Sequence, residues 1–381
     1  MSIHFVMLLC LPLLVLLLPR PGQTSPISCY NDKGIATDWF YLYKLPKFSG
    51  HTSAAEGLLY LLLDKGNSGW LDGMATVNDS ASALGSTVGQ LYTPESRETA
   101  FILYNDQQPD GVPADRKKHS YNGHGGHTKG VVMLDKEQGF WLVHSTPRFP
   151  PVRQGGAFAY PHSGVKNGQN FLCITFPLQS FQTIGEQLKI NQVAVYDCDV
   201  PPSLATLVPS LAALCKKKRA MSNATVTEDK QVSNRSVTLT SQGGTQFISF
   251  AKGATFKNDL YHAWVAPTLQ SDLLVQFWRA SSSPVLPSDC SLGWKVLDIS
   301  LLSPGKKPSY NTTHDHSKWA VSTVAAGGPG GGWVCVGDIN RIQAQEFRGG
   351  GTVCQRNPAV WKAYRTTALQ CEMCGGATGQ C

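Results

Sequence analysis

The sequence predicts a mixed α/β (α+β) fold made of two pseudo-symmetric halves, each a sheet with covering helices. Strand-type segments outnumber helical ones along the chain, which argues against a helical bundle. A short His-x-Lys motif occurs twice, as His127-Thr128-Lys129 and His316-Ser317-Lys318, 189 residues apart. Only 15% of the residues are charged, and 37 glycines and 23 prolines indicate a loop-rich chain with a substantial apolar core.

The expected strands are segments rich in aromatic and β-branched residues, the content typical of buried strands. They are 39–45, 101–104, 130–134, 140–143, 171–176, 236–240 and 295–301. The expected helices are 54–63, 181–188, 204–215 and 258–269, the last ending near Pro267.

Composition divides the chain into four parts. Residues 1–24 are predicted to be a signal peptide and residues 25–215 the N-terminal half with the first motif. Residues 216–235 are polar, begin with a basic run (KKKR) and are predicted to be a solvated linker or loop, with a nucleic-acid contact or a processing site as alternatives. Residues 236–381 form the C-terminal half, in which the Gly-rich segment 324–332 is expected to be a flexible loop at the rim of the site.

The N-terminus predicts an exported protein. Residues 5–18 are almost wholly apolar and end in Pro19-Arg20-Pro21-Gly22, a run too short to span a bilayer comfortably. We expect cleavage near Thr24, with an uncleaved anchor as the alternative because the charged region before the run is weak. The mature protein is then expected in lysosomes or in secretions, without stable membrane association.

Cysteine usage agrees with export. Loss of Cys10 with the leader leaves ten of the eleven cysteines, an even number that suits disulfides in an oxidising lumen. The tail, Cys371-Glu-Met-Cys374 followed by Cys381, is interpreted as disulfide-bonded rather than as part of a zinc knuckle. Four sequons predict N-glycosylation in surface loops, at Asn78, Asn223, Asn234 and Asn311.

The charge of the chain favours polyanionic partners. The formal charge of +7 at pH 7 remains strongly positive without Arg20, and acidity adds charge through the ten histidines. Such a surface attracts nucleic acid or anionic lipid, although charge alone says nothing of catalysis.

The two His-x-Lys motifs carry the chemistry. A histidine is a workable nucleophile toward phosphorus, and a second, protonated histidine can give a proton to a leaving oxygen. In an extended strand residues i and i+2 point to the same face, so each histidine lies beside an ammonium group able to hold a phosphate oxygen. If the halves are related by a pseudo-two-fold axis, both motifs reach one cleft.

The repeat extends beyond the motifs. Trp141 follows the first histidine and Trp333 the second, and seven residues after each Trp stand Arg148 and Asn340. This comparison places a cation in one half where the other half has an amide.

A metal site is the competing interpretation of the first motif. His119, His124 and His127 form H-x4-H-x2-H in a Gly-rich segment, which has the spacing of metal ligands. A metal on His127 would block the nucleophile and no acidic ligand is close in sequence, so we expect no metal and no cofactor, and place His119 and His124 on a rim loop.

Blocks of sequence in a fixed order resemble the deoxyribonuclease II family, acid endonucleases with a phospholipase D-like fold. The resemblance runs from Cys29 nearly to the C-terminus. Its blocks are Asp38-Trp39-Phe40, Tyr43-Lys44-Leu45-Pro46, Leu103-Tyr104-Asn105-Asp106, Gly126-His127-Thr128-Lys129-Gly130, Gly139-Phe140-Trp141-Leu142-Val143-His144-Ser145, His316-Ser317-Lys318-Trp319, Cys335-Val336-Gly337-Asp338 and Arg348-Gly349-Gly350-Gly351-Thr352.

The resemblance implies a metal-independent mechanism on double-stranded DNA. One histidine attacks the phosphodiester, giving a phosphohistidine that water opens to a 3′-phosphate, while the other protonates the departing 5′ oxygen. Lys129 and Lys318 would hold the non-bridging oxygens. We place His127 as nucleophile and His316 as general acid; the reverse satisfies the same symmetry. An acid pH optimum is expected, and one chain working as a monomer suffices.

The same resemblance suggests further site residues and disulfides. His144, Ser145, Asp338 and Asn340 stand where relatives contact phosphate or the catalytic histidine. No Asp follows either Lys at the spacing usual in the superfamily, so that role is not assigned. The pairs expected are Cys29–Cys173, Cys198–Cys215, Cys335–Cys354 and Cys290–Cys371, the last with its tail partner open.

Two other functions remain as alternatives. A non-catalytic or toxin-type DNA-binding protein on this scaffold would not need both His-x-Lys pairs, and all four of those residues are present. A phospholipase would share the chemistry, but the sequence blocks resemble the nuclease branch.

Overall fold

The protein is seen here as a computed structural model that describes residues 26–47, 57–93, 98–112, 125–216, 232–280 and 282–381. The predicted signal peptide, the predicted rim residues His119 and His124, the sequon at Asn223 and residues 217–231 of the predicted linker lie outside these ranges. Within the described part, Asn78 and Asn311 are exposed and Asn234 is half-buried.

The N-terminal half is built on an eight-stranded sheet in the order β10-β6-β7-β8-β9-β3-β4-β5, with every neighbouring pair antiparallel. Both faces of its central strands are buried, which explains why they are apolar along their whole length instead of alternating. The small sheet β1 (Cys29–Tyr30) and β2 (Ala36–Thr37) precedes it. The eight strands are β3 (Trp39–Lys44), β4 (Tyr60–Asp64), β5 (Leu71–Asp72), β6 (Ala100–Asn105), β7 (Lys129–Leu134), β8 (Gln138–His144), β9 (Gln169–Pro177) and β10 (Val195–Asp199).

The C-terminal half is built on a ten-stranded sheet in the order β11-β12-β18-β17-β16-β13-β14-β19-β20, with β15 on β14. Its pairs are antiparallel except β13 with β14. Its strands are β11 (Asn234–Thr240), β12 (Gln246–Lys252), β13 (Leu273–Gln276), β14 (Val296–Leu302), β15 (Tyr310–Asn311), β16 (Trp319–Ser322), β17 (Trp333–Gly337), β18 (Gly350–Arg356), β19 (Ala368–Glu372) and β20 (Thr378–Gln380).

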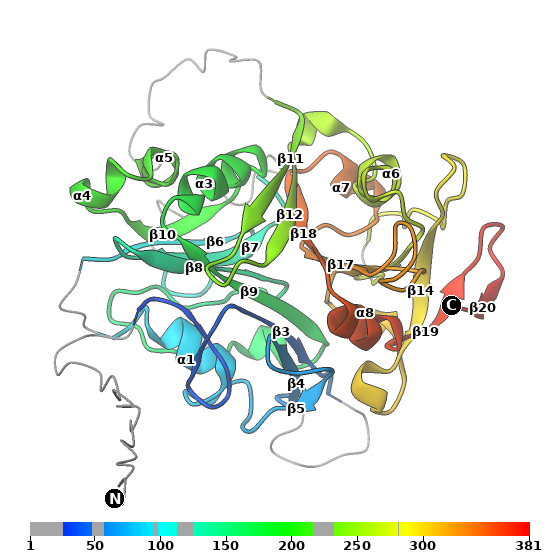
Figure 1. Ribbon diagram of the computed structural model, residues 1–381, viewed down its shortest axis with the longest axis horizontal. Coiled ribbons are helices and arrows are strands. Elements are labelled where there is room, and N and C mark those ends of the chain that lie inside the picture. Colours follow the sequence, from blue (N-terminus) through cyan, green and yellow to red (C-terminus); the bar gives the residue numbers. More distant parts are fainter. Residues whose placement is uncertain (1–25, 48–56, 94–97, 113–124, 217–231, 281) are drawn as a thin grey trace, which may run out of the picture.

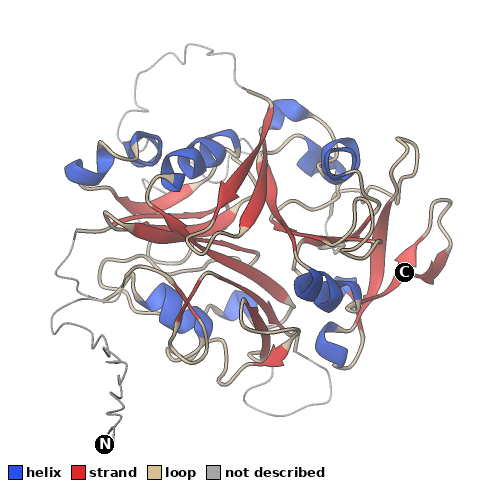
Figure 2. Cartoon of the chain, in the orientation of Figure 1, coloured by secondary structure: helices blue, strands red, loops and turns tan. Residues whose placement is uncertain are grey.

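Helices cover the sheets on both sides (Figures 1 and 2). The α-helices are α1 (Ala83–Gly89), α3 (Ser180–Ile190), α4 (Pro202–Ala205), α5 (Pro209–Lys216), α6 (Ala266–Leu269), α7 (Gln343–Glu346) and α8 (Pro358–Arg365). Short helical turns are η1 (His162–Gly164), η2 (Ala254–Phe256), the π-helical η3 (Tyr261–Val265), η4 (Pro304–Lys306) and η5 (Thr312–His314). A central core joins both sheets with α3 and α8, while α1 and α6 cover separate clusters on the outer faces.

A shared arrangement of five strands relates the halves. The order β6-β7-β8-β9-β3 in the first sheet is repeated as β13-β16-β17-β18-β12 in the second, with every pairing antiparallel. Lys129 opens β7, and Lys318 directly precedes β16. The expected mixed fold of two pseudo-symmetric halves is confirmed, and the largely antiparallel sheets make it α+β.

The expected helix at 54–63 is wrong where the structure describes it. Residues 60–64 form β4, whose main chain pairs with β3 from Tyr60 opposite Lys44 to Asp64 opposite Phe40. A run of leucines has strong helix propensity, but pairing in a sheet buried on both faces overrides it.

Other element boundaries also differ from expectation. The helix expected at 204–215 is two helices, α4 and α5. The helix expected at 258–269 ends at Leu269 as expected, but its helical part begins only at Tyr261, with η3, and continues as α6. Of the residues expected in the linker, Lys216 belongs to α5, and Asn234 and Arg235 belong to β11.

The structure forms five disulfides within the described ranges. Cys29–Cys173, Cys198–Cys215 and Cys335–Cys354 are as expected.

Cys290 pairs with a cysteine of the tail, as expected, but the named partner Cys371 is wrong and the partner is Cys374. Cys371 is buried in β19, and the antiparallel return through β20 brings Cys381 back to it, giving Cys371–Cys381. Cys374 lies in the turn between these strands and pairs with Cys290.

The described helices include none with the length and apolar character needed to cross a membrane.

Candidate active site

The two motifs meet where the halves face each other. Each histidine stands just before its strand, and its main-chain N–H and its ring Nδ1 bond to main-chain oxygens of the opposite half. These contacts are reciprocal, residue for residue.

His127 is held by the C-terminal half. Its main-chain N–H donates to Gly349 O, 2.8 Å away, and its ring Nδ1 lies 2.5 Å from Asp338 O. Gly349 precedes β18, and Asp338 follows β17. An added Cβ on Gly349 would lie 2.3 Å from the main-chain oxygen of Asn191, so only glycine fits this crossing.

His316 is held by the N-terminal half in the same way. Its N–H donates to Gly168 O, 2.8 Å away, and its Nδ1 lies 2.9 Å from Ser145 O. Gly168 precedes β9, and Ser145 follows β8. A Cβ on Gly168 would lie 2.5 Å from an oxygen of Asp315.

These contacts fix the tautomers of both rings. A carbonyl oxygen can only accept, so Nδ1 carries the proton in each histidine and donates it. The same proton prevents the Lys318 ammonium group, 3.0 Å from His316 Nδ1, from donating to that nitrogen. Nε2 is left with its lone pair in both neutral rings, which is the atom that can attack or carry a proton.

The pseudo-symmetry extends to Ser145 and Asp338. Ser145 Oγ accepts the N–H of Asn170 at 3.0 Å, and Asp338 Oδ1 accepts the N–H of Gly351 at 2.9 Å. The side chain of each thus fixes the following strand, while its carbonyl orients a histidine of the other half. Asn170 also bonds to the second motif, because its side-chain oxygen accepts the main-chain N–H of Lys318.

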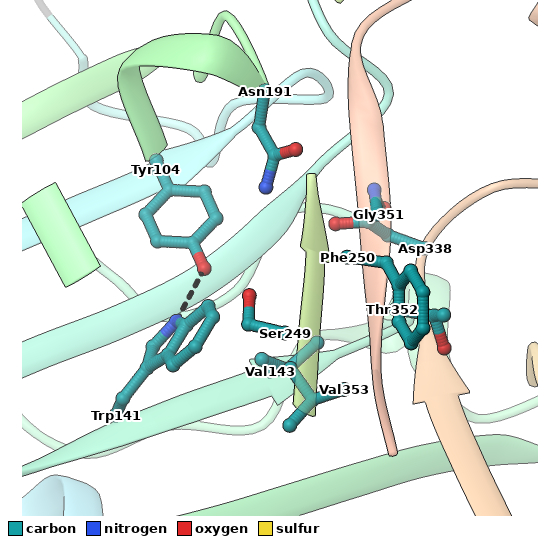
Figure 3. A pocket seen from close by; sticks show the side chains of 10 residues that line it. All are labelled: Tyr104, Trp141, Val143, Asn191, Ser249, Phe250, Asp338, Gly351, Thr352 and Val353. Carbon is teal, nitrogen blue, oxygen red and sulfur yellow. Dashed lines mark hydrogen bonds between the residues drawn. The ribbon is translucent and has the colours of Figure 1, made fainter. Parts of the chain in front are cut away.

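Asp338 lies against a small pocket between the halves (Figure 3). The pocket has a volume of about 10 Å³, and its wall includes Tyr104, whose hydroxyl accepts the indole N–H of Trp141 at 2.9 Å. It is too small for a substrate. Burial raises the pKa of the Asp338 carboxyl to about 7.

The lysines differ in their partners. Lys129 Nζ lies 2.5 Å from Asp106, whose other oxygen is 3.2 Å from Arg348 of the opposite half and 4.0 Å from His127 Nε2. Burial raises the pKa of Asp106, but Lys129, His127 and Arg348 outweigh it and hold the pKa well below its usual range. Lys318 Nζ instead donates to His316 O at 2.5 Å.

The pKa values of both histidines are lowered. Burial lowers the pKa of His127 well below its usual value; Asp106 opposes this, while Lys129, Lys318 and Arg348 reinforce it. Burial, then Lys318 and Lys129, lower the pKa of His316. Both lysines lower the pKa of each histidine, so the charges of these four residues are coupled.

The two halves differ in the residue that follows the first strand of the five-strand arrangement. Asp106 follows β6, whereas Trp278, two residues after β13, packs its ring 5.2 Å from that of His316. Asn340 fixes this tryptophan by accepting its main-chain N–H at 3.0 Å. One histidine thus has a carboxylate beside it and the other an indole.

His144 lies apart from this cluster. Its ring packs against Phe149 and Phe171, and its Nδ1 accepts the N–H of Thr146. Burial lowers the pKa of His144, which favours the neutral ring in this aromatic environment.

The proposed equivalence of Trp141 with Trp333, and of Arg148 with Asn340, is wrong by one residue. Val132, three residues after Lys129, pairs with Trp141, but Val321, three after Lys318, pairs with Val334. The residue equivalent to Asn340 is then Pro147, because Ser145 corresponds to Asp338.

Sequence reasoning did not single out Asp106, Arg348, Asn170 or Trp278. Asp106 and Arg348 lie in two of the sequence blocks, which was the only signal for them; Asn170 and Trp278 had none. Within the described ranges, no group of three or more His, Cys, Asp or Glu side chains is arranged to hold a metal ion.

The fold and the site together define a phospholipase D-like enzyme in which two pseudo-symmetric halves share one site. The sequence model of the deoxyribonuclease II family matches residues 28–374, and the chain belongs to that family as an enzyme of the deoxyribonuclease II type.

Named relatives match over nearly their full length. The chain is 42% identical to deoxyribonuclease-2-alpha of Mus musculus, covering 95% of this chain and 97% of that protein. It is 37% identical to deoxyribonuclease-2-beta of Homo sapiens, with 92% of each chain covered. It is also 36% identical to plancitoxin-1 of Acanthaster planci, covering 97% of this chain and 98% of that protein.

Proposed function

We propose that the protein is a metal-independent acid endonuclease that cuts double-stranded DNA to 3′-phosphate and 5′-hydroxyl ends. The observation that supports this most is the reciprocal anchoring of His127 and His316 through Nδ1, which leaves Nε2 of each ring for chemistry.

In the first step, His127 Nε2 attacks phosphorus and the bond from phosphorus to the 5′ oxygen breaks. His316 Nε2–H gives its proton to that oxygen, so the leaving strand ends in a hydroxyl group. In the second step His316 takes a proton from water, the water oxygen attacks phosphorus, and the P–N bond breaks to release a 3′-phosphate and neutral His127. Lys129 and Lys318 stabilise the charge on the non-bridging oxygens.

An acid optimum follows from the environment of the general acid. His316 must be charged to donate, and burial with the neighbouring lysines lowers its pKa. The fraction of His316 that carries a proton therefore falls as the pH rises, so kcat/KM falls toward neutral pH.

One chain supplies both halves of the site, which supports a monomeric enzyme. The ten cysteines in disulfides and the apolar N-terminal run support export with a cleaved leader, to lysosomes or secretions.

Supercoiled plasmid incubated with the protein at pH 5 in EDTA, beside His127→Ala and His316→Ala, tests the proposal. We expect nicking by the wild type alone, with phosphate on the 3′ ends. Cleavage that survives in both variants would refute the site, and a strict requirement for Mg²⁺ or Ca²⁺ would refute metal independence. Binding without cutting by the wild type would favour the DNA-binding alternative.

A further inference from the structure

Two buried lysines outside the motifs occupy matching places in the two halves. Lys44 is the last residue of β3 and Lys252 the last residue of β12, and both side chains are fully buried. Lys44 pairs with Gln169, the first residue of β9, and Lys252 pairs with Gly350, the first residue of β18. The pseudo-symmetry therefore makes them equivalent.

Their ammonium groups make equivalent contacts. Lys44 Nζ donates to the main-chain oxygens of Val165, 2.8 Å away, and of Asn167. Lys252 Nζ donates to those of Glu346 at 3.0 Å and Arg348 at 2.6 Å, and also to that of Gln345 at 2.9 Å.

The acceptors that the two halves have in common lie in the loops whose glycines bond to the two histidines. Val165 and Asn167 stand three residues and one residue before Gly168. Glu346 and Arg348 stand at the same distances before Gly349. Gly168 O accepts the N–H of His316, and Gly349 O accepts that of His127.

We propose that Lys44 and Lys252 are a matched pair of positioning residues, each fixing the loop that orients the histidine of the opposite half. Lys44 acts on His316 and Lys252 on His127. The roles of the two histidines rest on the proposed function, but this pairing of each lysine with one histidine does not.

Burial of a charged ammonium group is unfavourable, so its contacts have to compensate for that burial. Burial disfavours its charge and lowers the pKa to about 7 for Lys44 and about 8 for Lys252. Asp315 opposes this at Lys44; Asp259, Glu346 and Asp338 oppose it at Lys252, while Arg348 adds to it. At pH 5 both remain charged, and a charged group with several N–H donors satisfies several loop carbonyls at once.

The two lysines predict different kinetic defects. Loss of Lys44 displaces the proposed general acid, and loss of Lys252 displaces the proposed nucleophile. A substrate whose leaving group needs no proton, the p-nitrophenyl ester of thymidine 3′-phosphate, relieves a defect of the acid in the first step but not a defect of the nucleophile. The second step, in which His316 activates water, is the same on both substrates.

The test compares Lys44→Met and Lys252→Met with His316→Ala and His127→Ala on an oligonucleotide and on this ester, at pH 5. We expect each Met variant to lose roughly 10- to 100-fold in kcat on the oligonucleotide. On the ester, the first turnover, in which p-nitrophenol leaves and the phosphohistidine forms, should recover in Lys44→Met as it does in His316→Ala, and in Lys252→Met it should stay as low as in His127→Ala. The ratio of the two rates does not depend on the fraction of folded enzyme, so a partly unfolded Lys44→Met still gives an answer. Lys252→Met is expected to keep the wild-type ratio, so its rates are compared per mole of folded enzyme.

Two controls separate positioning from general damage. Gln187→Met removes a buried donor to main-chain oxygens of β11 and β12 away from both loops, and should leave the substrate ratio unchanged. Lys44→Gln and Lys252→Gln keep N–H donors and should retain more activity than Met. If either lysine variant departs from the substrate preference of its paired histidine variant, the positioning proposal is overturned. If the histidine variants exchange behaviour but each lysine still follows its own histidine, only the assignment of nucleophile and acid fails.

Discussion

Replacement of Asp338 by Asn tests whether the carboxyl beside His127 holds a proton in the folded protein. The side chain is buried, one oxygen accepts the N–H of Gly351, and burial raises its pKa from 3.8 to about 7. Asn keeps an acceptor for that N–H and resembles the protonated acid. The substitution thus removes the titration with little change in shape.

The expected magnitude follows from the size of this shift. Because the folded pKa lies above the unfolded one, the folded state keeps a proton that the unfolded state has released. Asp338 therefore contributes stability that is complete below about pH 4 and lost as the pH rises through about 7. A pKa of about 7 in place of 3.8 corresponds to a free-energy difference of about 4 kcal/mol.

Urea unfolding at pH 4 and pH 8, at constant ionic strength and with the disulfides intact, measures this difference. Between these pH values the free energy of unfolding of the wild type should fall by about 4 kcal/mol more than that of Asp338→Asn. The exposed carboxylate Asp199 provides a control, because Asp199→Asn should follow the wild type. Parallel curves for the wild type and Asp338→Asn would refute the reasoning.

Three further substitutions have defined outcomes. Gly349→Ala should lower kcat for DNA at least tenfold because its Cβ would collide with main chain, whereas Gly89→Ala, where the space is open, should not; equal activities would contradict the crossing geometry. Arg348→Met removes an ion pair and two main-chain contacts that join the halves, so kcat/KM should fall roughly tenfold in steady-state assays, and an unchanged value would count against that role. Cys290→Ser should leave its single free thiol on Cys374 in peptide mapping, and a free thiol on Cys371 would contradict the pairing.

Local pattern was enough to predict seven of the strands and the approach of the two His-x-Lys motifs to each other. Segments such as 39–45 and 171–176 carry their own strand signal, and the spacing of His and Lys places both side chains on one face whatever the rest of the fold. The leucine-rich segment that became β4 shows the limit, because its conformation is decided by pairing with β3 and not by its own propensity.

Several residues around the histidines could not be found from local pattern. Asp106 and Arg348 are 242 positions apart in sequence and meet only after the two sheets have packed. Lys44 lies in one of the sequence blocks, but the block gives no sign of its contacts, which appear only once the loop before β9 is in place. The one-residue offset between Trp141 and Trp333 likewise depends on strand register. The sequence does not give this register, because the loop 324–332 separates the strands in the second half.

The central claim is that two halves of one chain supply one nucleophile and one acid to the same phosphodiester. Mapping the covalent intermediate tests it most directly: His316→Ala is given the p-nitrophenyl ester of thymidine 3′-phosphate, quenched in alkali to preserve phosphohistidine, digested and analysed by mass spectrometry. We predict a thymidine 3′-phosphoryl adduct on His127, accumulating because the group that activates water is gone. Turnover by His316→Ala with no adduct on any histidine would contradict the account.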